Sequence, residues 1–274
     1  MNGIKGNNKW LIYAGLMAAS AIVLYPFFFM IINSFKSGSE IMHAPNALPK
    51  AWSLKGYIEV FESINLFRIF FNTIFVSVSV MVLNCLLSAM VAFAIAKTNM
   101  PNRDLWLRLI LSSMMVPAIL FTIPVYMMMY DWGWVNTYRV LIIPGAISAY
   151  NIFLLYQFMK QIDKAYLEAA RIDGASEFRI FFKVVLPMMR PALATVGILT
   201  FMGAWNDFMG PLLYIRDDSM LTLQMALFKF QQDIPAGNLE QVWAITTMIA
   251  VPVVFAFFFM QKNFIKAFTG VGVK

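Results

Sequence analysis

The amino-acid sequence predicts an all-α integral membrane protein built as a six-helix bundle. Of its 274 residues 61% are hydrophobic and 13% are charged, which is about half the charged fraction of an ordinary soluble domain. The apolar residues, 26 Phe and 21 Met among them, fall in runs near the 20 residues that a helix needs to cross about 30 Å of hydrocarbon. Because lipid offers no partners to backbone polar groups, such runs are expected to form internally bonded helices.

Six runs reach this length, and together they are expected to form one transmembrane domain over residues 1–274. They are Trp10–Ile32, Ile69–Ala96, Leu109–Tyr130, Val140–Met159, Pro191–Ile215 and Val242–Met260. The first run is longer than the apolar core of a signal peptide and has no cleavage site after it, so we expect an anchor. The fifth run is interrupted by Trp205-Asn206-Asp207.

The distribution of basic residues predicts the orientation of these spans. With six spans, 14 of the 21 Lys and Arg residues fall on the side of both termini and 7 on the other. Basic residues are enriched in cytoplasmic loops, so both termini are expected in the cytoplasm. The net charge of +7 therefore reflects mainly the enrichment of basic residues in cytoplasmic segments. It does not indicate nucleic-acid binding.

The loops differ in what their composition indicates. The two long extracytoplasmic loops, 33–68 and 212–241, are read equally well as solvated connections or as a docking surface for a soluble partner. The cytoplasmic segment 160–190 is more regular. Asp163 can cap a helix over Lys164–Ile172, and Ser176 can cap a second helix that Pro187 redirects. This hairpin could lie on anionic lipid, or it could fit a groove of a cytoplasmic partner.

Motifs in this segment resemble those of a known family. Residues 168–175 read Glu-Ala-Ala-Arg-Ile-Asp-Gly-Ala and residues 184–187 read Val-Val-Leu-Pro. They are similar to the EAA loop of bacterial ABC importer permeases, with Val184 in place of isoleucine. Trp205-Asn206-Asp207-Phe208 resembles a segment of carbohydrate-uptake permeases. The tail 264–274 resembles that of their maltose-G-like subunit, although Ala267-Phe268 departs from the common Gly-Leu.

The resemblance implies a type I ABC importer transmembrane domain in the bacterial inner membrane. Its implied partners are a homologous second permease in a heterodimer, a cytoplasmic ABC ATPase dimer, an extracytoplasmic solute-binding protein and membrane lipid. A carbohydrate, with an oligosaccharide favoured, is the implied substrate. The residues implied to couple to the ATPase are Glu168, Ala169, Ala170, Asp173, Gly174, Leu186 and Pro187. Thr269, Gly270 and Gly272 of the tail are implied to contact the same subunit.

No cofactor is expected on this chain itself. It carries no G-x-x-x-x-G-K-[ST] phosphate loop, so ATP and Mg²⁺ are expected on the partner ATPase. One cysteine, Cys85, and one histidine, His43, provide neither a disulfide framework nor the usual ligands of a metal site.

Polar residues inside the predicted spans are candidates for the substrate path. They are Asn84, Ser88, Tyr150, Asn151, Trp205 and Asn206. Such residues can line a pore, or they can bond neighbouring helices together, and the sequence leaves both open.

Two other function classes fit the sequence less well. An ion-driven secondary carrier for small polar solutes would need no ATPase, but no clear inverted repeat supports it. A membrane-embedded enzyme is not supported, because the sequence contains no recognisable set of catalytic residues.

Overall fold

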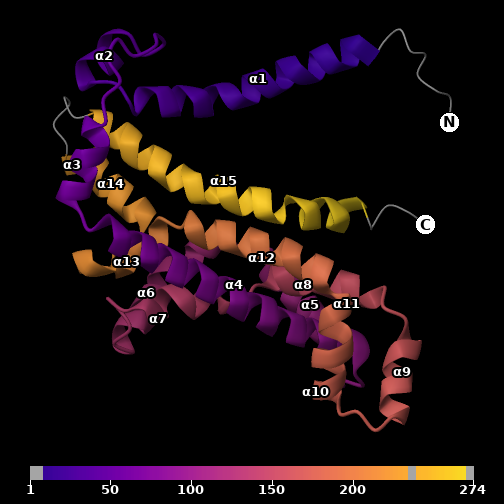
Figure 1. Cartoon of the computed structure of the whole chain (residues 1–274). Helices are drawn as coiled ribbons and strands as arrows, with labels where there is room; N and C mark the ends of the chain where they lie inside the picture. Colours follow the sequence, from indigo (N-terminus) through magenta and orange to yellow (C-terminus); the bar gives the residue numbers. More distant parts are fainter. Residues whose placement is uncertain (1–8, 234–238, 270–274) are drawn as a thin grey trace. The chain divides into compact units, whose positions relative to one another are not determined.

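The structure is a computed structural model that describes residues 9–233 and 239–269. Within these ranges every regular element is helical (Figure 1). The chain divides into two compact units, Met1–Leu66 with Leu227–Pro252, and Phe67–Ala226 with Val253–Lys274. The expectation of a single domain over residues 1–274 stays a prediction.

The first unit holds the beginning of the chain and a late segment. Its elements are α1 (Lys9–Asn33), α2 (Gly38–His43), α3 (Lys55–Ser63), the end of α14 (Leu223–Asp233) and the start of α15 (Leu239–Thr269). The ring of Phe29 in α1 meets that of Trp243 in α15 edge to face, with centroids 5.5 Å apart. Gln241 of α15 donates to a carboxylate oxygen of Glu59 in α3 at 2.7 Å.

The second unit carries the predicted coupling segment and most of the buried core. Its helices are α4 (Leu66–Lys97), α5 (Arg103–Ser113), α6 (Thr122–Asp131), α7 (Tyr138–Ile142), α8 (Ala149–Lys160), α9 (Lys164–Ile172), α10 (Glu177–Ile180), α11 (Leu186–Met188), α12 (Arg190–Trp205) and α13 (Met209–Tyr214). A π-helical turn, Phe181–Val185, connects α10 to α11.

Three helices of the described ranges are long and apolar enough to cross a membrane: Ile12–Asn33, Leu66–Lys97 and Tyr138–Lys160. Two bent pairs bring the number to five if each pair is counted as one span. The last predicted span falls in α15, of which the part Leu239–Phe255 is apolar but short. The count of six spans therefore stays a prediction.

The first bent pair differs from the single helix expected at 109–130, whereas the second bends at residue 189, just before the span expected at 191–215. That span is divided at 206–208 between α12 and α13, next to the interruption seen in the sequence. Arg103–Ser113 and Ala118–Asp131 meet at 88°, and Glu177–Met188 and Arg190–Trp205 meet at 81°. Proline explains both breaks. Pro117 disfavours helical geometry at the preceding residue, and Pro191 lies in the first turn of α12, where its missing N–H is tolerated.

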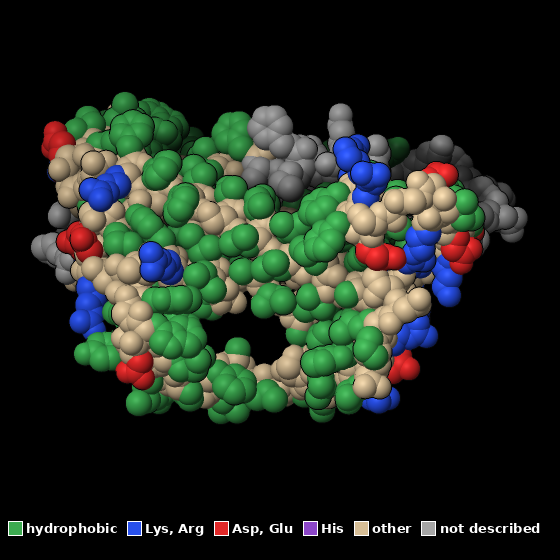
Figure 2. All heavy atoms as spheres, turned by 90° about the horizontal axis from the view of Figure 1, so that it is seen from below, with side chains coloured by type: hydrophobic (Ala, Val, Ile, Leu, Met, Phe, Trp, Pro, Cys, Tyr) green, Lys and Arg blue, Asp and Glu red, His purple; other side chains and the backbone are tan. Residues whose placement is uncertain are grey.

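Side chains are sorted as expected for a chain that lies in lipid. Figure 2 shows hydrophobic side chains over much of the visible face. Many large apolar side chains are exposed, including Phe71 and Met115. In a soluble protein such exposure would be unfavourable, whereas lipid accommodates it.

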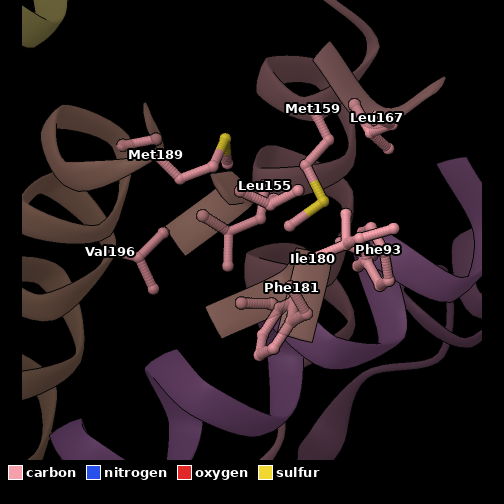
Figure 3. Packing of buried hydrophobic residues seen from close by; sticks show 12 residues of the cluster. Phe93, Leu155, Met159, Leu167, Ile180, Phe181, Met189 and Val196 are labelled. Carbon is pink, nitrogen blue, oxygen red and sulfur yellow. The ribbon is translucent and has the colours of Figure 1, made fainter. Parts of the chain in front are cut away.

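The main buried cluster of the second unit lies where α9 meets the longer helices (Figure 3). Its larger members are Phe93, Leu155, Met159, Leu167, Ile180, Phe181, Val185, Met189 and Val196. Met189 lies directly before α12, and the others come from α4, α8, α9, α10, the π-helical turn and α12. This cluster connects the predicted coupling segment to the membrane helices.

Candidate functional site

The candidate site is the hairpin formed by α9 and α10, which lie side by side in Figure 1. Both helix caps predicted from the sequence are present. Asp163 accepts a hydrogen bond from the Ala165 amide at 3.0 Å, and Ser176 accepts one from the Arg179 amide at 3.4 Å. Each cap satisfies a backbone donor that the first turn of a helix leaves free. The ends of the hairpin helices are therefore fixed locally.

The turn between the two helices depends on Gly174. This glycine has a φ of +76°, in the left-handed region that side chains with a Cβ disfavour. The Gly174 amide donates to the Arg171 carbonyl and the Ala175 amide to the Ala170 carbonyl, each at 3.0 Å. This pair of bonds is the Schellman motif, which ends a helix and reverses the chain. Asp173 is the residue at which α9 stops.

One face of α9 is held and the other is free in the isolated chain. Leu167 is 1% exposed and belongs to the main buried cluster, and Ala170 packs against that cluster. On the other side, Glu168 and Ala169 are exposed, and Ile172 is 87% exposed. The small Ala169 beside exposed apolar and acidic groups leaves a surface on which another protein can approach the helix closely.

A guanidinium group ties the end of α9 to two other elements. Arg171 donates through Nε and Nη2 to the two carboxylate oxygens of Glu177 in α10, at 2.8 and 3.3 Å. The same Nη2 donates to the backbone carbonyl of Lys97, the last residue of α4, at 3.1 Å. The hydrogen bonds to Glu177 raise the pKa of Arg171.

The second half of the motif lies where the hairpin turns into the membrane helix. Leu186 is half-buried against the main cluster, and Pro187 is exposed in α11. The π-helical turn before them buries Phe181 and Val185. The predicted tail contacts cannot be placed in the same way. Thr269 is the last residue of α15, and Gly270 and Gly272 lie outside the described residues.

Three of the predicted substrate-path residues form one buried network. Asn151 of α8 donates to Asn84 of α4 at 2.7 Å and to Thr200 of α12 at 2.9 Å. Asn84 in turn donates to the Gly145 carbonyl at 2.8 Å and accepts a bond from Ser88 at 3.3 Å. These side chains connect the helices of the second unit to one another.

The other three predicted path residues lie outside this network. Tyr150 is half exposed, at 50%. Trp205 is 1% exposed, and its indole N–H has no partner among the described residues. Asn206 donates to the Met202 carbonyl and accepts a bond from Gln224 at 3.2 Å. A role for any of the six in the substrate path stays a prediction.

The residues that hold the ends of α4 are not recognisable from the sequence alone. At the end near the coupling hairpin these are Arg171 and Glu177, six positions apart across the glycine turn. At the other end, Asn72 donates to the carbonyls of Ser219 and Leu221 at 3.0 and 2.9 Å. Pairs of this kind depend on tertiary contacts, and neither helical periodicity nor spacing indicates them.

Comparison with known proteins gives a consistent result. Residues 84–269 match the model of a family described as binding-protein-dependent transport system inner membrane component. The matched region contains α8 to α13 and the whole hairpin.

Individual relatives are similar over nearly the whole chain. The arabinooligosaccharides transport system permease protein AraQ of Halalkalibacterium halodurans is 33% identical, over 97% of this chain and 96% of that protein. The diacetylchitobiose uptake system permease protein NgcG of Streptomyces coelicolor is 34% identical, over 92% of this chain and 84% of that protein. A chain in the crystal structure of a bacterial ABC transporter that imports the acidic polysaccharide alginate has a TM-score of 0.85 and 26% identity. That match covers 96% of this chain and all of the other.

Proposed function

The chain belongs to the family of inner membrane components of binding-protein-dependent transport systems, and on that premise we propose that its hairpin couples sugar import to ATP hydrolysis by a separate subunit. In this proposal the chain is one permease of an ABC importer. It pairs with a homologous permease and a cytoplasmic ATPase dimer, and a solute-binding protein delivers the substrate outside.

The observation that carries the proposal is the two-sided character of α9. Its inner face is anchored by Leu167 in a cluster that includes residues of α4, α8 and α12. Its outer face presents Glu168, Ala169 and Ile172. A helix anchored in this way can pass a displacement to the membrane helices, because close-packed interiors deform little and shift as units.

Topology supports the same assignment. The hairpin and both termini fall on the side that is rich in Lys and Arg, which we propose to be cytoplasmic. The ATPase subunit would then contact α9 from the cytoplasm, and the tail that includes Thr269, Gly270 and Gly272 would lie on the same side.

The substrate that we propose is an oligosaccharide. The names of the relatives refer to arabinooligosaccharides and to diacetylchitobiose, and the alginate importer carries a polysaccharide. The exposed Asn206 offers an amide, which suits sugar hydroxyl groups, whereas the ring of Trp205 is buried. The companion permease could supply further contacts.

The test uses the assembled transporter in lipid nanodiscs. Glu168→Lys and Gly174→Pro are expected to abolish the ATP hydrolysis that the substrate-loaded binding protein stimulates, while membrane insertion stays normal. Stimulated hydrolysis that persists in both variants would contradict the proposal. Uptake by this chain alone, in vesicles that lack any ATPase, would instead favour an ion-driven secondary carrier.

A further inference from the structure

Lys97, the last residue of α4, is bonded to both ends of α9. Its ammonium group donates to the carbonyl of Ile162, just before α9, at 2.6 Å. Its own backbone carbonyl accepts the bond from Arg171, in the last turn of α9, at 3.1 Å. Lys97, at the end of α4, therefore forms hydrogen bonds next to the start of α9 and in its last turn.

The guanidinium of Arg171 is the only described group that joins three elements at this point, namely α9, α10 and α4. Its planar fork meets both oxygens of Glu177, and it caps a carbonyl that the end of α4 cannot satisfy within the helix. A lysine carries three donors on a single nitrogen, and that nitrogen cannot occupy the positions of both Nε and Nη2, so a lysine would not reproduce this set of bonds.

We propose that Arg171 is a positioning residue that makes α9, α10 and the end of α4 move together when the ATPase subunit displaces the hairpin. The inference rests on the proposed coupling function and adds a specific transmission path to it. The core contact of Leu167 holds α9 against the cluster, whereas Arg171 sets its direction relative to α4.

The exposure of the pair indicates that its main role is not stability. The Arg171 and Glu177 side chains are 39% and 48% exposed. Ion pairs this accessible contribute little to folding, because water screens them. Removing Arg171 should therefore leave the chain folded and assembled but change how hairpin motion reaches α4.

The experiment compares variants of the complete transporter, made of this chain, the companion permease and the ATPase dimer, in nanodiscs. The probes are Mg-ATP and the substrate-loaded binding protein, and the readouts are basal hydrolysis, stimulated hydrolysis and assembly by size exclusion. For Arg171→Ala we expect normal assembly and basal hydrolysis, with stimulated hydrolysis lowered by at least about fivefold, the lower range of allosteric coupling. The binding-protein concentration at half-maximal stimulation should not change.

Three further variants make the result specific. Arg179→Ala removes the same charge from an exposed site on α10 and should keep stimulated hydrolysis within twofold of the unmodified transporter. Arg171→Lys should behave like Arg171→Ala, because a single nitrogen cannot replace both Nε and Nη2 of the planar guanidinium. The exchange Arg171→Glu with Glu177→Arg restores the ion pair but not the guanidinium at position 171, so it should not restore stimulation.

Several results would overturn the inference. Stimulated hydrolysis within twofold of normal in Arg171→Ala would do so, as would full rescue by the charge exchange. Loss of assembly in both Arg171→Ala and Arg171→Lys would show a structural role instead. Failure of the proposed function is distinguishable, because the unmodified transporter would then show no stimulated hydrolysis at all.

Discussion

The side-chain amide of Asn151 donates to the side-chain oxygen of Asn84, Oδ1, at 2.7 Å, and both residues are almost completely buried. This bond joins α8 to α4, and the second bond from Asn151, to Thr200, extends the connection to α12. Buried amides that satisfy one another in this way fix the register of neighbouring helices. The hairpin of α9 and α10 thus packs against a group of helices that are linked by polar side chains as well as by apolar contacts.

Replacement of Asn151 by leucine is expected to destabilise the second unit. The change removes a partner from the half-buried Thr200 and from the buried Asn84, whose side-chain oxygen keeps only the bond from Ser88. A buried polar group left without a partner costs about 1–3 kcal/mol, which is an upper bound here. Interhelical bonds in membranes are often at the lower end of that range. The midpoint of thermal unfolding of the purified transporter should fall. Tyr150→Phe is the matched control, since Tyr150 is half exposed, and an equal midpoint for both variants would contradict the role of the network.

Leu167→Ala is expected to loosen the coupling helix. Leu167 is 1% exposed in the main cluster, and truncation of a buried leucine costs about 2–5 kcal/mol. The hairpin contains three trypsin sites, Lys164, Arg171 and Arg179, so trypsin should cleave it faster in this variant.

Ile172→Ala provides the contrast to that variant. Ile172 is 87% exposed, so its truncation should not change the rate of tryptic cleavage. If the outer face of α9 contacts the ATPase subunit, the same variant should weaken that association in a pull-down measurement. Faster cleavage in Ile172→Ala than in Leu167→Ala would reverse the assignment of the two faces.

Gly174 can be tested by the residue types that tolerate its backbone conformation. At a φ of +76°, valine is strained, whereas asparagine adopts the left-handed region more readily. Gly174→Val should therefore abolish stimulated ATP hydrolysis, and Gly174→Asn should retain part of it. Equal activity of the two variants would show that the backbone conformation of the turn is not needed.

Gly56→Ala tests the contact of α3 with α15 in the first unit. A Cβ at position 56 would lie 2.6 Å from the carbonyl oxygen of Glu240, a backbone atom that cannot move aside freely. The variant should disturb the neighbouring bond between Glu59 and Gln241. We expect faster hydrogen exchange at the start of α15, and unchanged exchange there would contradict the tight packing.

The local structure of the hairpin could be predicted well from the sequence. Asp163 and Ser176 act as caps and Gly174 ends α9 with a positive φ, because these features depend on residues only a few positions apart. The break near Pro117 was less predictable. Proline is tolerated in many membrane helices, and whether it kinks or divides a helix depends on the neighbours that satisfy the freed backbone groups.

Tertiary contacts at the site could not be predicted in the same way. Asn84 and Asn151 are 67 positions apart, and Arg171 meets the carbonyl of a residue 74 positions away. The sequence identified the two asparagines as polar residues inside spans, but it left open whether they line a pore or bond between helices. In the structure the two asparagine side chains form a hydrogen bond with each other. They also form hydrogen bonds with Thr200, with Ser88 and with the carbonyl of Gly145.

Site-specific cross-linking from α9 tests most directly whether the hairpin contacts the ATPase. In a chain with Cys85→Ser, a cysteine is introduced either at Ala169 or at the exposed Glu62 of α3, and the transporter is treated with a short thiol cross-linker. We predict that the cysteine at position 169 captures the ATPase subunit and that the cysteine at position 62 does not. Capture of the ATPase from position 62, or its absence from position 169 in an assembled transporter, would contradict the coupling role of α9.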